Sequence, residues 1–225
     1  MRQKIHRQGL SIVFGALFLL TRLGQSFAGL ADHNETRLSH GGQVSGYLDF
    51  ITSSDFIVDV AENWQSEYLQ FFLFILATVW LVQKGSPESK KVGDAGLGTD
   101  EEQLVGEYAK PNSPAWAKVD GWRRVLFSNS LLLVMGAVFL LSWWAQSLAG
   151  VVVYNETQME HGQDTVTWAG YVISADFWNR TLQNWQSGLL AVGRMVTLSI
   201  FLRQRGSSES KPVGTPYDET ATEGE

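Results

Sequence analysis

The sequence predicts an all-α integral membrane protein with four transmembrane helices, arranged as two tandem helical hairpins that form a parallel repeat. Three observations predict this fold class: four apolar blocks in an otherwise polar chain, an ungapped repeat at an offset of 121 residues, and an uneven distribution of Lys and Arg. The connector between the hairpins and the C-terminal tail are expected to be disordered and cytoplasmic, because both are polar and lack apolar periodicity.

The repeat is clearest in two motifs that flank the even-numbered spans. Asn63–Ser66 reads Asn-Trp-Gln-Ser and recurs at Asn184–Ser187, while Gly85–Lys90 recurs with one substitution as Gly206–Lys211. Each copy contains an even number of predicted spans, so both copies must insert with the same orientation. The two hairpins are therefore expected to be related by a pseudo-two-fold axis along the membrane normal.

The first hairpin is assigned to residues 1–93. Its first apolar run extends from Gly9 to about Leu30 and is about long enough to cross a ~30 Å hydrocarbon core. A cleaved signal peptide is the alternative, with Ser26-Phe27-Ala28 as the cleavage site. The recurrence of Gln25–Gly29 in mid-chain favours a retained helix. A polar loop over 31–62 and a helix start at Ser53 or Ser54 lead to the second block, Tyr68–Val82.

The rest of the chain is divided in the same way. Residues 94–121 are predicted to be a flexible cytoplasmic connector, because they are rich in Gly, Pro, Ser and charge. Residues 122–214 form the second two-span repeat, with apolar blocks at 125–153 and about 185–202. Residues 215–225 are predicted to be a disordered acidic tail.

Charge sets the expected orientation and excludes several function classes. Thirteen Lys and Arg residues lie in the termini and the 84–124 connector, against two in the 31–66 and 154–184 loops. The positive-inside rule then places both termini in the cytoplasm. The chain has no Cys, which excludes disulfides and thiol chemistry, and no basic cluster that indicates nucleic acid.

The sharpest candidates for function are polar residues at span depth: Arg22, Glu67, Gln70 and Arg194. A cation inside a membrane is costly and normally faces protein or water. Stripes such as Ser187, Arg194 and Thr197 are therefore expected to point inward, and an Arg22–Glu67 contact is geometrically reasonable. Three interpretations remain open: a buried polar seam that joins the helices, a path for a solute, anion or proton, or a contact with anionic lipid.

A second set of candidates forms a repeated motif at the outer interface. Its members are Gln25, Ser26, Asn63, Trp64, Gln65, Ser66, Gln146, Ser147, Asn184, Trp185, Gln186 and Ser187. Such a ring of amides and hydroxyls is either a hydrogen-bonded belt or a site for a polar headgroup or quinone-like ligand. His40 and His161 recur beside Glu35 and Glu156, but two ligands per loop are too few for a metal site. No metal, cofactor or catalytic residue is predicted.

The second copy of the motif also carries a resemblance. The run Arg203-Gln204-Arg205 followed by Gly206–Lys211 and Pro212-Val213, after Asn-Trp-Gln-Ser and an apolar span, resembles a family of bacterial membrane proteins known only as a domain of unknown function. The first copy departs from it, with Val82-Gln83-Lys84 and with Lys91 in place of Pro. The resemblance implies a location in the bacterial cytoplasmic membrane and supplies no activity.

Together these features predict a non-enzymatic structural or accessory membrane protein. The expected partners are the lipid bilayer and either another membrane protein or a second copy of the chain, with no nucleic acid. The alternative is a small transporter or channel that uses Arg22, Glu67 and Arg194.

Overall fold

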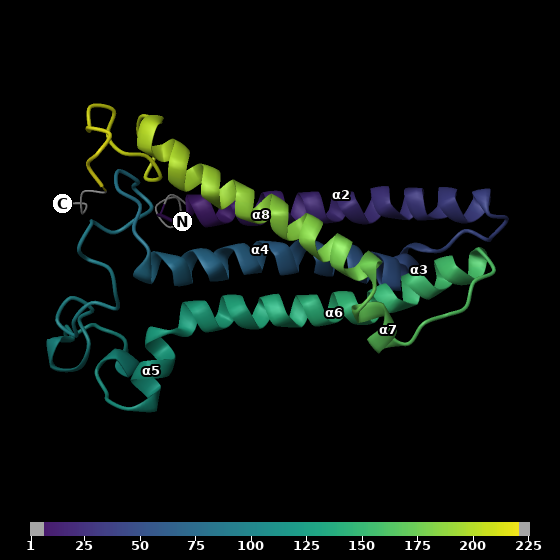
Figure 1. The fold of residues 1–225 in the computed structure, drawn as a ribbon, viewed down its shortest axis with the longest axis horizontal. Coiled ribbons are helices and arrows are strands. Elements are labelled where there is room, and N and C mark those ends of the chain that lie inside the picture. The colour runs from purple at the N-terminus through teal and green to yellow at the C-terminus, as the bar shows by residue number, and fades with distance from the viewer. Residues whose placement is uncertain (1–6, 221–225) are drawn as a thin grey trace. The chain divides into compact units, whose positions relative to one another are not determined.

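The computed structural model describes residues 7–220, which contain α-helices and turns and no strand (Figure 1). Four long helices dominate: α2 (Gly9–Ser39), α4 (Ser54–Trp80), α6 (Ser130–Glu160) and α8 (Ala175–Phe201). The short elements are α3 (Tyr47–Ile51), α5 (Trp122–Ser128), α7 (Trp168–Val172) and the 3₁₀ turns η1 (Gly106–Tyr108) and η2 (Ala115–Ala117). The helical fraction is 65%, so the all-α prediction is confirmed.

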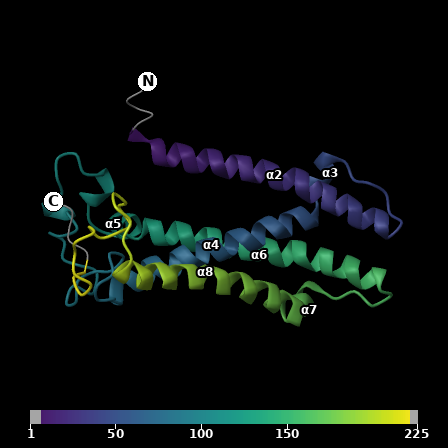
Figure 2. The ribbon, with the colours of Figure 1, turned by 90° about the horizontal axis from the view of Figure 1, so that it is seen from above.

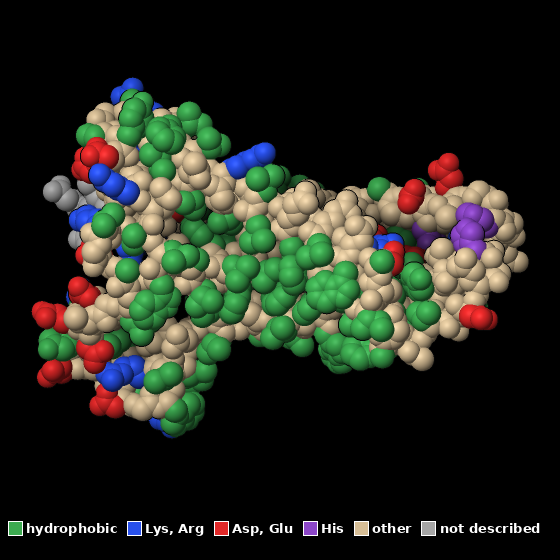
Figure 3. Space-filling model, viewed as in Figure 1, with side chains coloured by type: hydrophobic (Ala, Val, Ile, Leu, Met, Phe, Trp, Pro, Cys, Tyr) green, Lys and Arg blue, Asp and Glu red, His purple; other side chains and the backbone are tan. Residues whose placement is uncertain are grey.

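Two helices, α2 and α6, are long and apolar enough to cross a membrane. Only 6% and 17% of the residues in their most apolar windows are buried, which is unlike the core helix of a soluble protein. Figure 3 shows hydrophobic side chains exposed along the helices. α4 and α8 carry polar residues such as Asn63 and Gln186 in their first halves, and neither contains a stretch apolar enough to meet the same test of length and hydropathy. Of the four predicted spans, two are therefore supported by length and composition.

The helix boundaries recur along the chain. α2 and α6, α3 and α7, and α4 and α8 each begin and end 121 residues apart, for example at 54 and 175 and at 80 and 201. The cause is local. Ser53 and Ser174 accept hydrogen bonds at the two helix starts, from the backbone N–H groups of Phe56 and Phe177.

α2 continues beyond the predicted end of the first apolar block. Residues 31–39 were expected to be loop, yet the helix runs to Ser39 and ends in a glycine cap at Gly41, where φ is +75°. The backbone N–H of Gly42 donates to the carbonyl of Arg37 at 2.8 Å, closing the last turn. α6 ends in the same way at Gly162, where φ is +68°. The hydrogen-bonded ladder thus extends past the apolar residues from which the span was predicted.

The chain divides into two compact units. Unit 1 comprises residues 1–61 and 145–172, and unit 2 comprises residues 62–144 and 173–225. Each unit therefore takes residues from both predicted two-span segments, and the domain boundaries at 93, 121 and 214 remain predictions from sequence.

The core of unit 1 forms where short helices meet glycines. A Cβ on Gly29 would lie 2.9 Å from the Phe50 ring, and one on Gly150 would lie 2.5 Å from the Tyr171 hydroxyl. Phe50 is 3% exposed and Tyr171 is 1% exposed. The Phe50 ring of α3 can pack on α2 because Gly29 has no side chain. The Tyr171 ring of α7 can pack on α6 because Gly150 has none.

The core of unit 2 is an aromatic cluster. Trp143 of α6 lies 6.1 Å from Phe177 and 5.6 Å from Trp185, both of α8, measured between ring centroids. Gly188 of α8 receives Gln70 of α4, whose Oε1 would be 2.8 Å from an added Cβ. Figure 2 shows α8 running alongside α4 in this unit. Aromatic packing and close approach at a small residue therefore join α4, α6 and α8.

The connector and the start of the tail differ from the prediction of disorder. In the connector, the backbone N–H of Gly96 donates to Val79 at 2.7 Å, and Arg124 pairs with Asp100 at 3.3 Å. In the tail, Thr220 accepts a hydrogen bond from the Gly85 backbone N–H at 3.1 Å. These segments lack apolar periodicity, but turns and side-chain bonds satisfy their backbone groups. The tail residues 221–225 lie outside the described residues.

Candidate functional site

The predicted outer-interface serines of unit 1 are buried and hydrogen-bonded. Ser26 Oγ lies 2.8 Å from the Tyr47 hydroxyl, and Trp168 Nε1 donates to Ser147 Oγ at 3.0 Å. Each serine is 4% exposed, and each partner lies 21 residues further along the chain. These two hydroxyls tie α2 to α3 and α6 to α7, as expected of a hydrogen-bonded belt.

The preceding glutamines behave differently from each other. Gln146 is fully buried, at 0% exposed, whereas Gln25 is exposed and its Oε1 accepts a hydrogen bond from Arg22 at 2.8 Å. The Arg22 guanidinium also lies over the Phe56 ring, 4.5 Å from its centroid. Arg22 is therefore half-buried in unit 1 with protein partners of its own. Glu67 belongs to unit 2, and the Arg22–Glu67 contact stays a prediction.

Two asparagines, Asn34 and Asn155, each hold a following loop segment through a pair of hydrogen bonds. Asn34 donates through Nδ2 to the Ser45 carbonyl at 3.1 Å and accepts at Oδ1 from the Ser45 backbone N–H at 2.7 Å. Asn155 makes the same pair of bonds to Val166, at 2.9 and 2.8 Å. Each asparagine lies in a long helix, Asn34 in α2 and Asn155 in α6. Its side-chain amide makes two hydrogen bonds to the backbone of one residue in the loop that follows the helix.

His33 was not singled out from the sequence, although it contacts three side chains in unit 1. Its Nδ1 lies 3.2 Å from Asp55 Oδ2, its Nε2 lies 3.2 Å from Ser45 Oγ, and its ring lies 5.2 Å from that of Phe50. The corresponding residue 121 positions later is Tyr154, whose ring lies 5.4 Å from Tyr171. A histidine at an aromatic position of the repeat was the signal that could have found it.

The Asn-Trp-Gln-Ser segments lie in unit 2 and use different members in each copy. In α4, Gln65 and Ser66 are buried, whereas Asn63 and Trp64 are exposed. In α8, Asn184 and Trp185 are half-buried, whereas Gln186 and Ser187 are exposed. Trp185 Nε1 donates to Gln65 Oε1, and Ser66 Oγ donates to the Asn184 carbonyl at 2.7 Å. The two motifs therefore bind each other rather than forming a symmetric ring.

The candidate polar residues of α4 and α8 do not share one buried face. Glu67 and Arg194 are exposed, and Gln70 is half-buried against Gly188. Ser187, Arg194 and Thr197 are all exposed, so the prediction that this stripe points inward is wrong. The packed face of α8 carries Thr181, Gly188 and Ser199 instead. The buried face of α8 also holds Phe177 and Ile200, so it combines polar, small and large apolar residues, and polarity alone does not identify it.

An ion pair in unit 2 was also missed. Arg180 lies 3.4 Å from Glu62 and 3.3 Å from Asp176, which is one turn earlier on α8. The sequence was interpreted as placing Arg180 in an outer loop, but α8 begins at Ala175. The four-residue spacing from Asp176 to Arg180 is the signal that indicates a helix here.

The two Gly-Ser-x-Glu-Ser-Lys segments form loops with the same internal hydrogen bonds. In the first, Gln83 N–H donates to Ser89 Oγ at 2.7 Å and Glu88 N–H to Ser86 Oγ at 3.2 Å. In the second, Gln204 donates to Ser210 at 2.9 Å and Glu209 to Ser207 at 3.2 Å. Gly85 and Gly206 adopt φ of +86° and +85°, which is a conformation that favours glycine.

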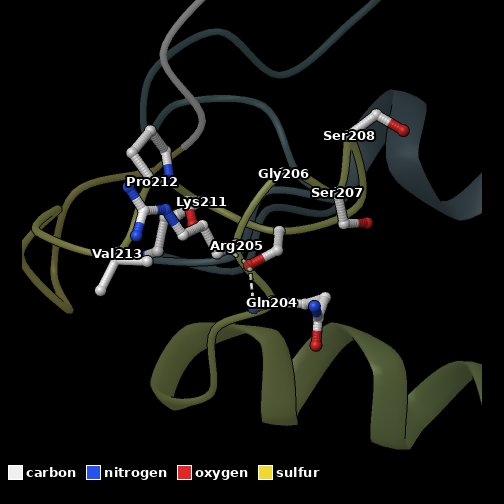
Figure 4. Close-up of a pocket in the computed structure, with 9 residues that line it drawn as sticks. Gln204, Arg205, Gly206, Ser207, Ser208, Lys211, Pro212 and Val213 are labelled. Atoms are coloured by element: carbon white, nitrogen blue, oxygen red, sulfur yellow. Dashed lines mark hydrogen bonds between the residues drawn. The ribbon is translucent and has the colours of Figure 1, made fainter.

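A lysine closes each loop. Lys90 Nζ donates to the Gly96 carbonyl, whereas Lys211 Nζ donates to Pro216, Tyr217 and Glu219 at 3.1, 3.2 and 2.9 Å. Lys211 is only 4% exposed, and burial, followed by the charge of Arg203, lowers the pKa of its ammonium group. Residues 204–208 and 210–213 line an open cavity of about 940 Å³. Figure 4 shows the side chains that line it.

The glutamates of the two loops are neighbours. Burial raises the pKa of Glu88, and the charge of Glu209 and a hydrogen bond between the two side chains raise it further.

Within residues 7–220 no three His, Cys, Asp or Glu side chains converge as metal ligands. His40 and His161 each hydrogen-bond through Nδ1 to the carbonyl one turn earlier, at 2.8 and 2.7 Å.

A family model for a domain of unknown function, DUF6766, matches residues 1–222. The chain belongs to the DUF6766 family. The match confirms the resemblance to an uncharacterised family. No curated protein and no solved structure matches this family member.

Proposed function

We propose that the chain is a non-enzymatic structural or accessory protein of the bacterial cytoplasmic membrane. In this proposal α2, α4, α6 and α8 all cross the bilayer, as two parallel repeated hairpins with cytoplasmic termini. The observation that carries the proposal is that the repeated polar side chains bond to the protein's own chain. Ser26, Ser147, Gln65 and Ser66 each hydrogen-bond across elements, which is the behaviour of a scaffold.

The number of spans is testable because four spans and two spans place the connector on opposite sides. With four spans the connector is cytoplasmic and the loop at 163–167 is external; with α2 and α6 alone, the two exchange sides. The chain has no Cys, so Leu97→Cys and Asp164→Cys can be labelled one at a time in intact cells with an impermeant maleimide. Four spans predict labelling at 164 and protection at 97. The reverse pattern would leave only two spans.

The accessory role is tested by purifying the full chain in a mild detergent and identifying the proteins and lipids that accompany it. A membrane protein in stoichiometric amount, retained through gel filtration, is the expected result. A monodisperse chain that carries no partner would count against the accessory role.

The second candidate function is a small transporter or channel that uses Arg22, Glu67 and Arg194. The observation that favours it is the exposure of the Arg194 side chain in α8. A cation exposed within a span needs water or an anion beside it. Anion flux into proteoliposomes that falls in Arg194→Ala and persists in Arg194→Lys would support transport, and background flux in all three proteins would refute it.

A further inference from the structure

A cluster of exposed aromatic side chains lies just before α6, in unit 2. The 3₁₀ turn η2 packs on α5, and the rings of Trp116 and Trp122 meet edge to face with centroids 6.1 Å apart. Trp116 is 41% exposed, Trp122 is 67% exposed and Val125 is 62% exposed. A contiguous apolar patch of this kind is unfavourable in water and indicates a surface that is covered in the working protein.

Covalent connection limits what can cover this patch. α5 ends at Ser128 and α6 begins at Ser130, and α6 is one of the two helices apolar enough to cross a membrane. Ser130 lies eight positions after Trp122, which corresponds to about 12 Å at 1.5 Å per helical residue. If α6 crosses the bilayer, which the proposed function requires, Trp122 lies within about 12 Å of the point where the chain enters it.

The charges of the segment are also those that a lipid surface attracts. Residues 115–128 contain three cations and one carboxylate. Arg124 is half-buried between Asp120 at 3.0 Å and Asp100 at 3.3 Å, so it is already neutralised. Lys118 and Arg123 are exposed, and the Arg123 guanidinium lies over the Trp122 ring at 5.6 Å. Lys118 Nζ also donates a hydrogen bond to the uncharged Pro111 carbonyl. Indoles with adjacent exposed cations fit the headgroup region, where rings prefer the interface and cations meet lipid phosphates.

We propose that residues 115–128 are an interfacial anchor that binds anionic lipid at the membrane surface where α6 enters. Trp116, Trp122 and Val125 enter the headgroup region, and Lys118 and Arg123 contact the phosphates of anionic lipids. The anchor fixes the depth of α6 from outside the span, as an amphipathic surface helix does.

The experiment measures where a spin label at Val125→Cys resides in the full chain, reconstituted in vesicles of phosphatidylcholine and phosphatidylglycerol. Collisions with oxygen, which concentrates in lipid, are compared with collisions with a water-soluble nickel chelate. Leu97→Cys, an exposed apolar residue of the connector, is the aqueous control, and Leu140→Cys, exposed on α6, is the lipid control. The oxygen-to-nickel ratio at Val125 is expected to be several-fold above that at Leu97.

Each other pattern overturns the anchor for a different reason. If the label at Leu140 is in lipid while that at Val125 matches Leu97, α6 spans but the anchor does not exist. If the label at Leu140 is also open to nickel, the proposed span itself fails. Protection of Val125 from both reagents means that protein, either a partner or a second copy, covers the patch. An unchanged ratio in purely phosphatidylcholine vesicles, with Lys118→Gln and Arg123→Gln also without effect, refutes the role of anionic lipid.

Discussion

The two Asn-Trp-Gln-Ser segments have identical sequences and pack differently, whereas the two Gly-Ser-x-Glu-Ser-Lys loops differ in sequence and share their hydrogen bonds. In the helices, Gln65 is fully buried while Gln186 is exposed. In the loops, the same serine hydroxyls accept the same backbone N–H groups. Bonds that close within six residues depend on local sequence, while the buried face of a helix depends on its neighbours.

The loops also differ where they meet the rest of the chain. Lys211 gathers three carbonyls and Lys90 one, and the second loop alone is preceded by Arg203, where the first has Val82. Arg203 donates to the Ile200 carbonyl at 2.9 Å and to the Thr215 carbonyl at 3.0 Å. The bond to Thr215 holds the start of the tail beside the loop. The carbonyls of the residues that follow Thr215 therefore lie within hydrogen-bonding distance of Lys211.

The largest expected effect is a difference in unfolding free energy between alanine variants of the two Asn-Trp-Gln-Ser tryptophans. Trp185→Ala removes an indole from the aromatic cluster and leaves the Gln65 amide without its donor, so we expect a loss of about 3 kcal/mol in unfolding free energy. Trp64→Ala is the matched control: its ring is exposed and packs only near Tyr68, at 6.4 Å, among the ring contacts of the described residues. Unfolding in mixed micelles measures both, and equal losses would contradict the asymmetry.

The next comparison concerns the two loop glycines. Gly85→Ala would place a Cβ against the Tyr217 carbonyl at a positive φ, and we expect a cost of about 2–3 kcal/mol from strain and overlap together. Gly206→Ala meets nothing within 4 Å and carries only the strain of its φ, about 1 kcal/mol. Hydrogen exchange of residues 212–220 should rise in the first variant and stay near native in the second. Faster exchange in both would mean that strain alone dominates.

The two lysines provide a smaller contrast. Lys211→Met leaves three carbonyls without their ammonium donor and should cost about 2 kcal/mol, whereas Lys90→Met removes one bond and should cost about 1 kcal/mol. The readout is exchange protection of the carbonyl-bearing segments, 215–220 and 94–97. Similar effects at the two sites would show that the additional bonds of Lys211 contribute nothing.

The smallest effect is on pH dependence at the contact between the loops. The pKa of Glu88 is raised in the folded protein, so its contribution to stability is present below its unfolded pKa, near 4.5, and is lost as pH rises through the folded value. The melting temperature of the parent protein should therefore fall modestly between acidic and neutral pH, and this fall should be absent in Glu88→Gln.

Glu102 is the control of opposite sign for this titration. The backbone and side chain of Thr99 donate to Glu102 and lower its pKa, so its contribution is lost as pH falls. Glu102→Gln should leave the neutral-pH loss of the parent unchanged. A parent protein whose melting temperature rises with pH over this window would contradict the assignment to Glu88.

Much of the local structure was predictable from particular residues. The helix start at Ser54, the all-α class and membership of an uncharacterised family follow from the chain itself. The end of α2 was missed because the apolar run stops near Leu30, whereas the helix continues to Ser39. Asn34 bonds to Ser45 from within this extension, and Gly41 provides the turn that ends it. The inward orientation assigned to Arg194 was wrong because polarity alone does not select the buried face of α8, which holds Phe177 and Ile200 beside Thr181, Gly188 and Ser199.

Sequence alone thus specifies the features that depend on short range: helix starts, glycine caps and the serine-bonded loops, since each is satisfied within a few residues. Tertiary structure alone decides which of two identical motifs is buried, why His33 meets Asp55, and how many carbonyls each lysine binds. Those outcomes depend on groups brought together from distant parts of the chain, and a repeated sequence carries no information about neighbours that are not themselves repeated.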